Sequence, residues 1–527
     1  MSEGTNAASG SWRPSANPWL IAVTVTLAAF MEILDGTIIN VALPHISGAL
    51  GSSYDDATWA LTSYLVANGI VLTISAWFGK VLGRKRYFMI CIAMFTVCSF
   101  MCGLSTSLPM LIVFRLMQGF FGGGLQPNQQ SIILDTFPPD KRGAAFGLTA
   151  IATIVGPIMG PLLGGYLVDN FSWRWIFYVN VPFGILTMIG VALLVEDPPW
   201  ERPARQPVDV IGIALISLGL GGLEIMCDRG EDEDWFGSSF VTAMAVCGVA
   251  GTIGAVVWLR RARHPLVNLD IFKDRNFAAG TFLMGMMGAV LYASAVIVPQ
   301  FAQQVLGYTA TLSGLLLAPG GTVVILMIPV IGRMMGVVQV RAIIATGFLV
   351  MGASMFASAR LTPDIDFSHL VLFRIFQTAS LGFLFVPIST AAYSTLPREL
   401  NADGSAIFSM ARNYVGSLSI SLATATVIQA QQRQQAYLVD RMSPYRPEYQ
   451  HYLAVAKQAA LDAGMSPANA SQYAPYRLYR TFMSQVSLLA YNEVFMMIGL
   501  LAFSVVPLCF FLSPDRKRRS AAPASIH

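Results

Sequence analysis

Two acidic residues lie three positions apart inside the first long apolar stretch of the chain, near 18–43. Glu32 and Asp35 share one face of the helix that this stretch predicts, because positions i and i+3 are neighbours on a helix surface. At 1.5 Å per residue, Glu32 lies roughly 18 Å along a helix that starts at Leu20, which is near the middle of a bilayer. A low dielectric disfavours a charged carboxylate there. The chemistry that these residues suggest is proton uptake from one side of a membrane and release to the other.

A basic residue at comparable depth indicates an ion pair. Arg115 lies roughly 9 Å from the outer end of the fourth apolar stretch (109–133), which is where that stretch begins. Asp35 lies roughly 13 Å from Pro44, at the outer end of the first stretch. We expect Arg115 to approach Asp35 and favour its charged form, so that a proton or a substrate can exchange partners with the arginine. Three alternatives remain open: a purely structural ion pair, an acid that only fixes helix packing and, for Glu32, attraction of a cationic substrate.

The composition excludes several classes of protein. Only 12% of the residues are charged and 55% are hydrophobic, whereas soluble domains carry roughly 25% charged residues, so a water-soluble globule is excluded. The 33 basic and 29 acidic residues balance too closely to indicate a nucleic-acid partner. The six cysteines form no CxxC pair, and no phosphate-binding loop appears, since Gly79-Lys80 is followed by Val81. We expect no enzyme, no metal and no cofactor, and a proton gradient as the energy source.

Fourteen apolar stretches are long enough to cross a bilayer, which needs about 20 residues per helix. An even number places both termini on one side, and the excess of Lys and Arg in the connections on that side makes it the cytoplasm. The expected organisation is a cytoplasmic tail over 1–17, an N-terminal six-helix bundle over 18–197, two inserted transmembrane helices over 208–258, a C-terminal six-helix bundle over 276–512 with a periplasmic loop over 429–487, and a basic cytoplasmic tail over 513–527.

The two bundles carry an internal repeat. The segment LIVFRLMQGFFGGGL at 111–125 recurs as LVLFRIFQTASLGFL at 370–384, so that Arg115 and Gln118 reappear 259 positions later as Arg374 and Gln377. Two parallel repeats are a common plan for secondary transporters, with the substrate site near the midplane between them. The intramembrane polar residues expected to line that cavity, some of which will only bond neighbouring helices, are Gln118, Gln126, Asn128, Gln300, Gln377, Arg412 and Asn413.

Four motifs carry a resemblance to a known family: LDGTIINVALP at 34–44, Arg-x-x-Gln-Gly at 115–119, GPIMGPLLGG at 156–165 and WRWIFYVNVP at 173–182. On these motifs the chain resembles the major facilitator superfamily, specifically the 14-span drug/proton antiporters of the EmrB/QacA family. The DRG at 228–230 and the long segment before the last span are most similar to the EmrB branch. The resemblance implies an all-α integral membrane protein with the major facilitator fold, made of two six-helix bundles plus two inserted helices.

The same resemblance implies multidrug efflux, and hence antibiotic resistance, driven by the proton motive force from a bacterial inner membrane. In the EmrB branch the pump works with a periplasmic adaptor similar to EmrA and an outer-membrane channel. The dense tyrosines of 429–487 and a helix expected over 448–463, stopped by Gly464, suit such an adaptor interface. A segment that folds over its own transporter is the alternative.

Two further motifs concern gating and packing. The superfamily loop after the second span usually reads DRxGR, but Lys80 and Val81 replace its Asp and Arg, so that a gating role of that Asp cannot be transferred. What remains of this motif is Gly83, Arg84 and Lys85. In the fifth span, Gly156, Gly160 and Gly164 recur every fourth residue with Pro157 between them, which lets a neighbouring backbone approach closely.

These observations predict a proton-coupled exporter of amphiphilic or lipophilic compounds that works by alternating access. A proton-linked uptake permease for a specific solute and a non-transporting sensor with the same fold are the alternatives. An apolar cavity with few polar groups does not identify the transported compound.

Overall fold

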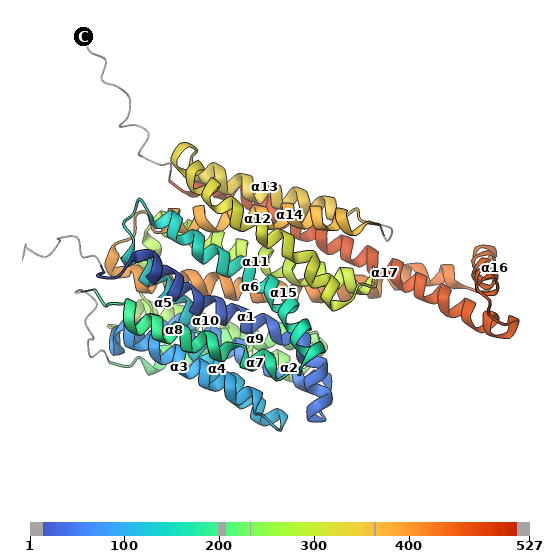
Figure 1. Cartoon of the computed structure of the whole chain (residues 1–527), viewed down its shortest axis with the longest axis horizontal. Coiled ribbons are helices and arrows are strands. Elements are labelled where there is room, and N and C mark those ends of the chain that lie inside the picture. The colour runs from blue at the N-terminus through green and yellow to red at the C-terminus, as the bar shows by residue number, and fades with distance from the viewer. Residues whose placement is uncertain (1–13, 199–206, 232, 363–364, 514–527) are drawn as a thin grey trace, which may run out of the picture.

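The structure, a computed structural model, describes residues 14–198, 207–231, 233–362 and 365–513 of the chain, and the regular elements in these ranges are helices (Figure 1). Most of the two expected tails, residues 1–13 and 514–527, therefore lies outside the described residues. The expected all-α membrane architecture is confirmed by the long apolar helices that follow one another along the chain.

The first half of the chain forms six spans. Its helices are α1 (Pro18–Leu50), α2 (Tyr54–Leu82), α3 (Arg84–Gly103), α4 (Leu108–Gly122), α5 (Leu125–Thr136), α6 (Arg142–Asn170), α7 (Trp175–Tyr178) and α8 (Asn180–Leu194). Helices α4 and α5 make up one span, which is broken at a glycine triplet. A Cβ atom added at Gly123 would lie 2.5 Å from the carbonyl oxygen of Asn68, so the glycine lets α2 pack directly against this break.

The inserted pair and the second half follow. The inserted helices are α9 (Val210–Arg229) and α10 (Ser239–Arg261), joined by the short helix η1 (Trp235–Gly237), and η2 (Leu269–Lys273) leads into the second half. The second half contains α11 (Arg275–Gln304), α12 (Ala310–Val337), α13 (Val340–Ser358), α14 (Phe367–Ala392), η3 (Arg398–Leu400), α15 (Asn401–Leu438), η4 (Val439–Met442), α16 (Pro447–Asp462), α17 (Pro467–Val505) and η5 (Val506–Phe511).

Thirteen helices of the described chain are long and apolar enough to cross a membrane. The fourteenth expected span, 404–428, lies within α15, which falls short of this apolar composition although it packs against α2, α5, α11 and α17. Its buried polar side chains, which include Asp403, Ser409 and Arg412, explain the shortfall. A helix surrounded by protein does not need the apolar surface that lipid demands.

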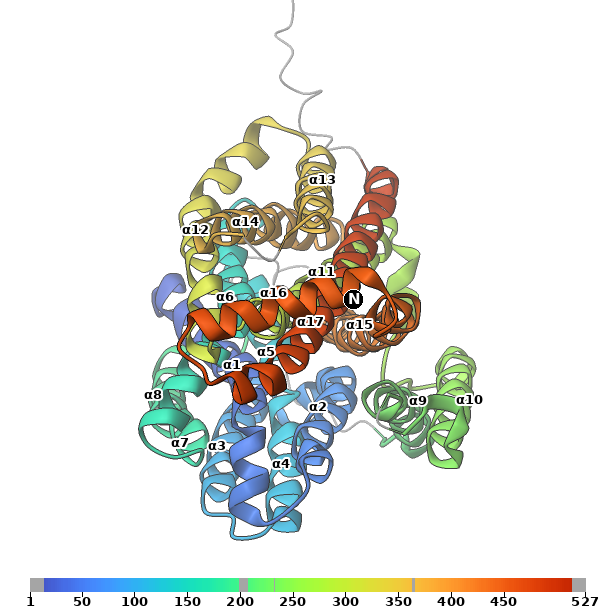
Figure 2. The same cartoon turned by 90° about the vertical axis from the view of Figure 1, so that its right-hand side faces the viewer.

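The two halves lie side by side, and the inserted pair flanks them (Figures 1 and 2). Helix α6 of the first half contacts α12 and α14 of the second, while α15 contacts α2 and α5. We call the boundary between the halves the seam. Helix α9 contacts both α2 and α15, so the inserted pair touches each half. We call the end of the bundle where α1 begins and α17 ends the termini face, and the other end the opposite face (Figure 1).

The segment over 429–487, expected as a long connection between spans that contains one helix, is helical over most of its length. Helix α15 continues to Leu438, and α17 starts at Pro467 and runs into the last span without interruption. The expected helix over 448–463 is confirmed as α16, and Gly464 follows it with a φ of 86°, a conformation that favours glycine. Together α16 and the first turns of α17 project beyond the bundle at the opposite face (Figure 1).

The three spaced glycines of α6 bring this helix against α1, as their spacing predicts. A Cβ atom at Gly160 would lie 2.2 Å from Oγ1 of Thr37, and one at Gly164 would lie 2.9 Å from the carbonyl oxygen of Ile38. At Gly156 the nearest atom is Cγ2 of Ile33, 2.6 Å away. Close packing of α6 therefore sets the position of α1, the helix that carries both acids.

We expect Gly160→Ala to lower the stability of the folded protein by about 1–3 kcal/mol, because the added methyl group overlaps Thr37 in a packed interface. Gly165→Ala is the matched control on the same helix, since no atom lies within 4 Å of a Cβ at that position. Thermal unfolding of the purified protein in detergent measures both changes. Equal melting temperatures for the two variants would contradict this account of the α1–α6 interface.

Candidate functional site

Asp35 lies at the centre of a fully buried polar cluster inside the first half. Nη1 of Arg115 donates to Oδ2 of Asp35 at 2.6 Å, and both side chains have no exposed area. Nε2 of Gln118 and Nδ2 of Asn180 both donate to Oδ1 of Asp35, at 2.9 Å and 2.7 Å. Asp35, Arg115, Gln118 and Asn180 are called the Asp35 cluster below. The expected approach of Arg115 to Asp35 is therefore observed.

The Asp35 cluster is held by four helices. Arg115 on α4 also donates from Nε to the carbonyl oxygen of Ala60 on α2, at 3.2 Å, and its guanidinium lies 4.0 Å from the ring centre of Tyr64. Asn180 stands at the junction of α7 and α8, where the helix restarts. Breaking a buried ion pair leaves an uncompensated charge, so the pair holds its geometry firmly, although Nη2 of Arg115 and Oδ1 of Asn180 have no hydrogen-bond partner among the described residues.

Glu32 lies one turn away in a different environment, at the seam. Nδ2 of Asn68 donates to its Oε1 at 2.9 Å, and Nε2 of Gln126 donates to its Oε2. The Oε1 of the same Gln126 side chain accepts a hydrogen bond from Nη2 of Arg412, which belongs to the second half. One amide thus joins an acid of the first half to a guanidinium of the second.

Two further groups, Asn413 and Tyr292, complete this seam cluster, defined as Glu32, Asn68, Gln126, Tyr292, Arg412 and Asn413. Asn413 donates to Oε1 of Gln126 at 3.3 Å and accepts from Nε of Arg412 at 3.1 Å. Tyr292 on α11 donates to Oδ1 of Asn413 at 3.3 Å. In contrast to Asp35, Glu32 has amide donors, and no guanidinium of the described residues lies within ion-pair distance of it. Its charge is therefore less fully compensated by the groups that touch it.

Polar bridges continue along the seam from this cluster to the termini face. Oγ of Ser409 donates to Oε1 of Gln130 at 3.1 Å, and Nδ2 of Asn401 donates to Oδ1 of Asp135 at 2.9 Å. At the end of this series Nζ of Lys80 on α2 forms an ion pair with Asp403 on α15 at 2.6 Å. These bridges join the halves at the termini face, so the seam is closed on that side.

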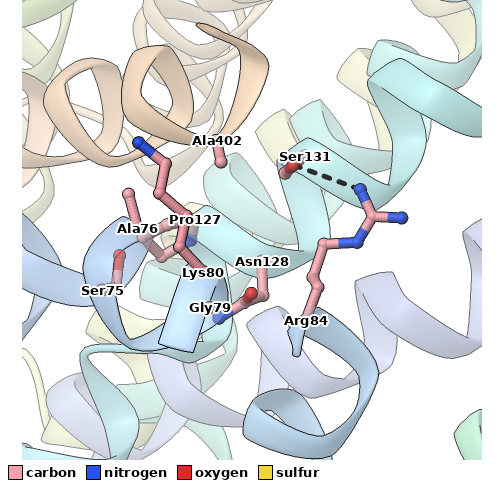
Figure 3. A pocket seen from close by; sticks show the side chains of 9 residues that line it. All are labelled: Ser75, Ala76, Gly79, Lys80, Arg84, Pro127, Asn128, Ser131 and Ala402. Atoms are coloured by element: carbon pink, nitrogen blue, oxygen red, sulfur yellow. Dashed lines mark hydrogen bonds between the residues drawn. The ribbon is translucent and has the colours of Figure 1, made fainter. Parts of the chain in front are cut away.

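The lysine that replaces the usual acid of the loop motif thus has a partner of opposite charge in the second half. Figure 3 shows Lys80 and Arg84 on either side of a small hollow that Asn128 and Ala402 help to line. Arg84 is buried and pairs with Asp135 of α5, and it donates to Oγ of Ser131 at 3.4 Å. Gly83 separates α2 from α3 with a φ of 86°, and Nζ of Lys85 donates to the carbonyl oxygen of Ala192 at 2.8 Å. Sequence reasoning missed Asp403, whose only signal was an acid at the start of a span.

The second half repeats the Asp35 cluster without its acid. Ser294 stands 259 positions after Asp35, the same offset that relates Arg115 to Arg374. Nη1 of Arg374 donates to Oγ of Ser294 at 3.3 Å, and Nε2 of Gln377 donates to Oγ of Ser358 at 3.1 Å. Nε and Nη2 of Arg374 have no hydrogen-bond partner among the described residues. The duplicated scaffold therefore keeps the guanidinium and loses the carboxylate.

The residues expected to line a cavity fall into separate groups. Gln126, Arg412 and Asn413 come together at the seam with Glu32. Gln118 and Gln377 lie inside their own halves as partners of the two buried arginines. Asn128 donates to the carbonyl oxygen of Gly124 at 2.6 Å near the termini face, and Gln300 is half-buried towards the far end of α11. Sequence reasoning also missed the seam partners Asn68 and Tyr292, because polar residues inside apolar stretches carry no sign of which helix they will face.

Comparison with known proteins gives consistent matches over most of the chain. Residues 25–420 match the family model described as Major Facilitator Superfamily. Multidrug export protein EmrB of Haemophilus influenzae is 33% identical over 496 residues, covering 94% of this chain and 96% of that protein. Multidrug export protein EmrB of Escherichia coli is 34% identical over 497 residues, covering 94% and 95%. The crystal structure of the human organic anion transporter MFSD10 has a similar fold, with a TM-score of 0.55 at 12% identity, covering 92% of this chain and 99% of that one.

We expect Ser294→Asp to stabilise the protein by about 2 kcal/mol, because a carboxylate at this position supplies the ion-pair partner that Arg374 lacks. Ser294→Asn is the matched control, since it adds similar volume without charge. Thermal unfolding in detergent gives the readout. If the Asp variant melts no higher than the Asn variant, the correspondence between the two clusters carries no energetic meaning.

Proposed function

The chain belongs to the Major Facilitator Superfamily, and from this premise we propose that it is a proton-coupled multidrug exporter that moves amphiphilic or lipophilic compounds out of the cell by alternating access. The observation that carries the proposal is the position of Glu32. It is an intramembrane acid at the seam, connected through Gln126 to Arg412 of the other half. Proton transfer to this acid changes the charge of a group on which closure of the seam depends.

The direction of the effect follows from the hydrogen bonds. The amide of Gln126 donates to the carboxylate of Glu32 and accepts from the guanidinium of Arg412, so its two polar ends are each matched to a charge. Protonation neutralises Glu32 and removes the negative charge that complements Arg412 through the amide. The seam is then less stable at Glu32, from which the polar bridges that join the halves continue to the termini face.

This sequence of events suits export. With both termini in the cytoplasm, as the distribution of basic residues indicates, the closed termini face is the cytoplasmic side. A proton from the periplasm reaches Glu32 while the seam is closed towards the cytoplasm, and protonation allows the cytoplasmic side to open. Release of that proton to the cytoplasm, with binding of the exported compound, restores the bridge. The Asp35 cluster remains sealed in this cycle and acts as a positioning element that holds α1 against α4.

The substrate class rests on the relatives. The two bacterial relatives are named multidrug export proteins, and a fatty acid resistance protein, FarB of Neisseria gonorrhoeae, is 28% identical over 494 residues. Compounds of these kinds share a large apolar surface rather than a common polar group. A seam with one acid, one guanidinium and several amides can orient such molecules without selecting one of them.

We place the protein in the bacterial inner membrane as the inner-membrane component of a tripartite pump. Support for an adaptor partner comes from the projection formed by α16 and the first turns of α17, which extends beyond the bundle (Figure 1). Tyr452 on α16 and Tyr476 on α17 are 61% and 55% exposed, and Tyr445, in the short connection directly before α16, is 96% exposed. Tyrosine is enriched where proteins bind one another. A projection that points away from the bundle suits a periplasmic adaptor better than a cover over the transporter's own cavity.

In proteoliposomes with an imposed pH gradient, we expect Glu32→Gln to abolish proton-driven dye transport, because the amide cannot bind a proton, and to retain exchange of substrate down its own gradient. Glu493→Gln is the control, since Glu493 pairs with Arg433 on the exposed part of the chain. Gradient-driven transport by Glu32→Gln at the wild-type rate would refute the proposed role. Accumulation of substrate with the proton gradient by the wild type would instead favour an uptake permease, and absence of substrate-dependent proton flux would favour a sensor.

We expect simultaneous replacement of Tyr445, Tyr452 and Tyr476 by Ser to reduce drug resistance of cells several-fold while leaving transport by the purified protein in proteoliposomes unchanged. The physical reason is that the replacement removes side chains that contact the adaptor and leaves every contact with the substrate unchanged. Tyr166→Ser, at an exposed position on α6, serves as the control. Altered transport in proteoliposomes would show that the projection acts on its own transporter.

A further inference from the structure

The inserted pair carries a buried acid that the mechanism above does not use. Glu224 lies on α9, five residues before its end at Arg229, and only 6% of it is exposed. Oγ of Ser417 on α15 donates to its Oε1. An ionisable group inside an apolar span is costly and usually faces protein or a water-filled cavity. Its placement against the second half is therefore informative.

The end of α9 is tied to the first half by groups other than Glu224. Oγ1 of Thr62 on α2 donates to Asp228, and Nη2 of Arg229 donates to the carbonyl oxygen of Asp55 at 3.1 Å. The guanidinium of Arg229 also lies 4.4 Å from the ring centre of Trp59. Figure 2 shows α9 next to α2, with α10 on the far side. These contacts attach α9 to the first half.

The bond from Glu224 to Ser417 crosses to the second half. Helix α15 belongs to the half that must move relative to α2 when access alternates, so this bond lies where the two moving bodies meet. Because α9 is anchored to α2 by Asp228 and Arg229, the Glu224–Ser417 bond is one of the contacts that must break when the halves separate at this level. Breaking it opens the carboxyl group of Glu224 to water and protons that enter between the halves.

The surroundings of Glu224 suit exchange of a proton. The titratable groups near it are Asp228 and Cys227 on its own helix and Tyr414 on α15. Helix α10 contributes Cys247 as its titratable group within the span, and α2 presents the apolar Val66 and Ile70 next to Gly221. The hydroxyl of Ser417 donates to a carboxylate and accepts from a protonated carboxyl group. Both protonation states of Glu224 therefore keep a partner when the seam is closed.

We propose that Glu224 is a second proton-binding site, which takes up a proton at the boundary between the inserted helices and α15 and releases it as that boundary opens and closes during transport. The step is a proton transfer alone, with no bond to the substrate. The proposal rests on the proposed proton-coupled export. It gives the inserted pair a function: the pair adds one proton to the number moved for each substrate molecule, in addition to the proton carried by Glu32.

The proton-to-substrate ratio tests this proposal. In proteoliposomes, the substrate gradient at which net flux stops is measured for several imposed pH gradients with a neutral substrate, and the slope of the logarithm of the substrate ratio against the pH difference equals the number of protons moved. We expect Glu224→Gln to lower this slope by one while net coupled transport continues. Glu224→Asp keeps the titratable group and is expected to keep the wild-type slope.

The outcomes separate this proposal from the one on which it rests. A wild-type slope in a folded Glu224→Gln protein overturns the second site and leaves proton-coupled export intact. A slope of zero in the wild type overturns proton coupling itself. If Glu224→Gln does not fold, labelling of the wild type with dicyclohexylcarbodiimide, which modifies protonated carboxyl groups in apolar surroundings, gives an independent readout. Modification of Glu224 that falls as pH rises supports the proposal, and modification that is absent or independent of pH overturns it.

Discussion

The charge of Glu32 and the charge of Arg412 belong to different halves of the molecule and meet through one amide, that of Gln126. Either charge alone is costly inside a membrane, and the amide satisfies both only while the halves touch at this level. The remaining bridges towards the termini face, from Ser409 to the ion pair of Lys80 with Asp403, depend on the same closure. Closing the seam and compensating the intramembrane charges are therefore a single event.

The internal repeat has kept its geometry and changed its electrostatics. In the first half, Asp35 neutralises Arg115 within a sealed cluster. In the second half Ser294 replaces the acid, so that Arg374 keeps a hydrogen-bond partner there but no negative charge. The first half thus carries Glu32 in addition to the Asp35–Arg115 ion pair. The second half carries Arg374 and Arg412, and neither forms an ion pair with an acid of its own half among the described residues. At the level of Glu32 this asymmetry brings opposite charges of the two halves together, whereas at the termini face the polarity is reversed, because Lys80 of the first half pairs with Asp403 of the second.

Helix α15 is where most of the polar bridges converge. Its residues Asn401, Asp403, Ser409 and Arg412 face the first half in succession, and Ser417 faces the inserted pair. This polar surface explains why α15 is less apolar than the helices around it. Residues 401–409 of α15 are almost all buried, and the polar side chains among them make contacts at the seam.

Much of the architecture follows from the sequence alone. Apolar length and helical spacing are local properties, so the spans, the depth of Glu32 and Asp35, the repeat and the glycine spacing of α6 could be predicted from neighbouring residues. The expected helix before Gly464 is local in the same way. The tertiary structure decided which charges meet. Lys80 and Asp403 are 323 positions apart, and Gln126 and Arg412 are 286, because these pairs form only when helices from distant segments pack with one particular rotation. A pattern along the chain carries no information about that rotation, and for this reason the seam and the position of Glu224 within it were visible only in the folded molecule.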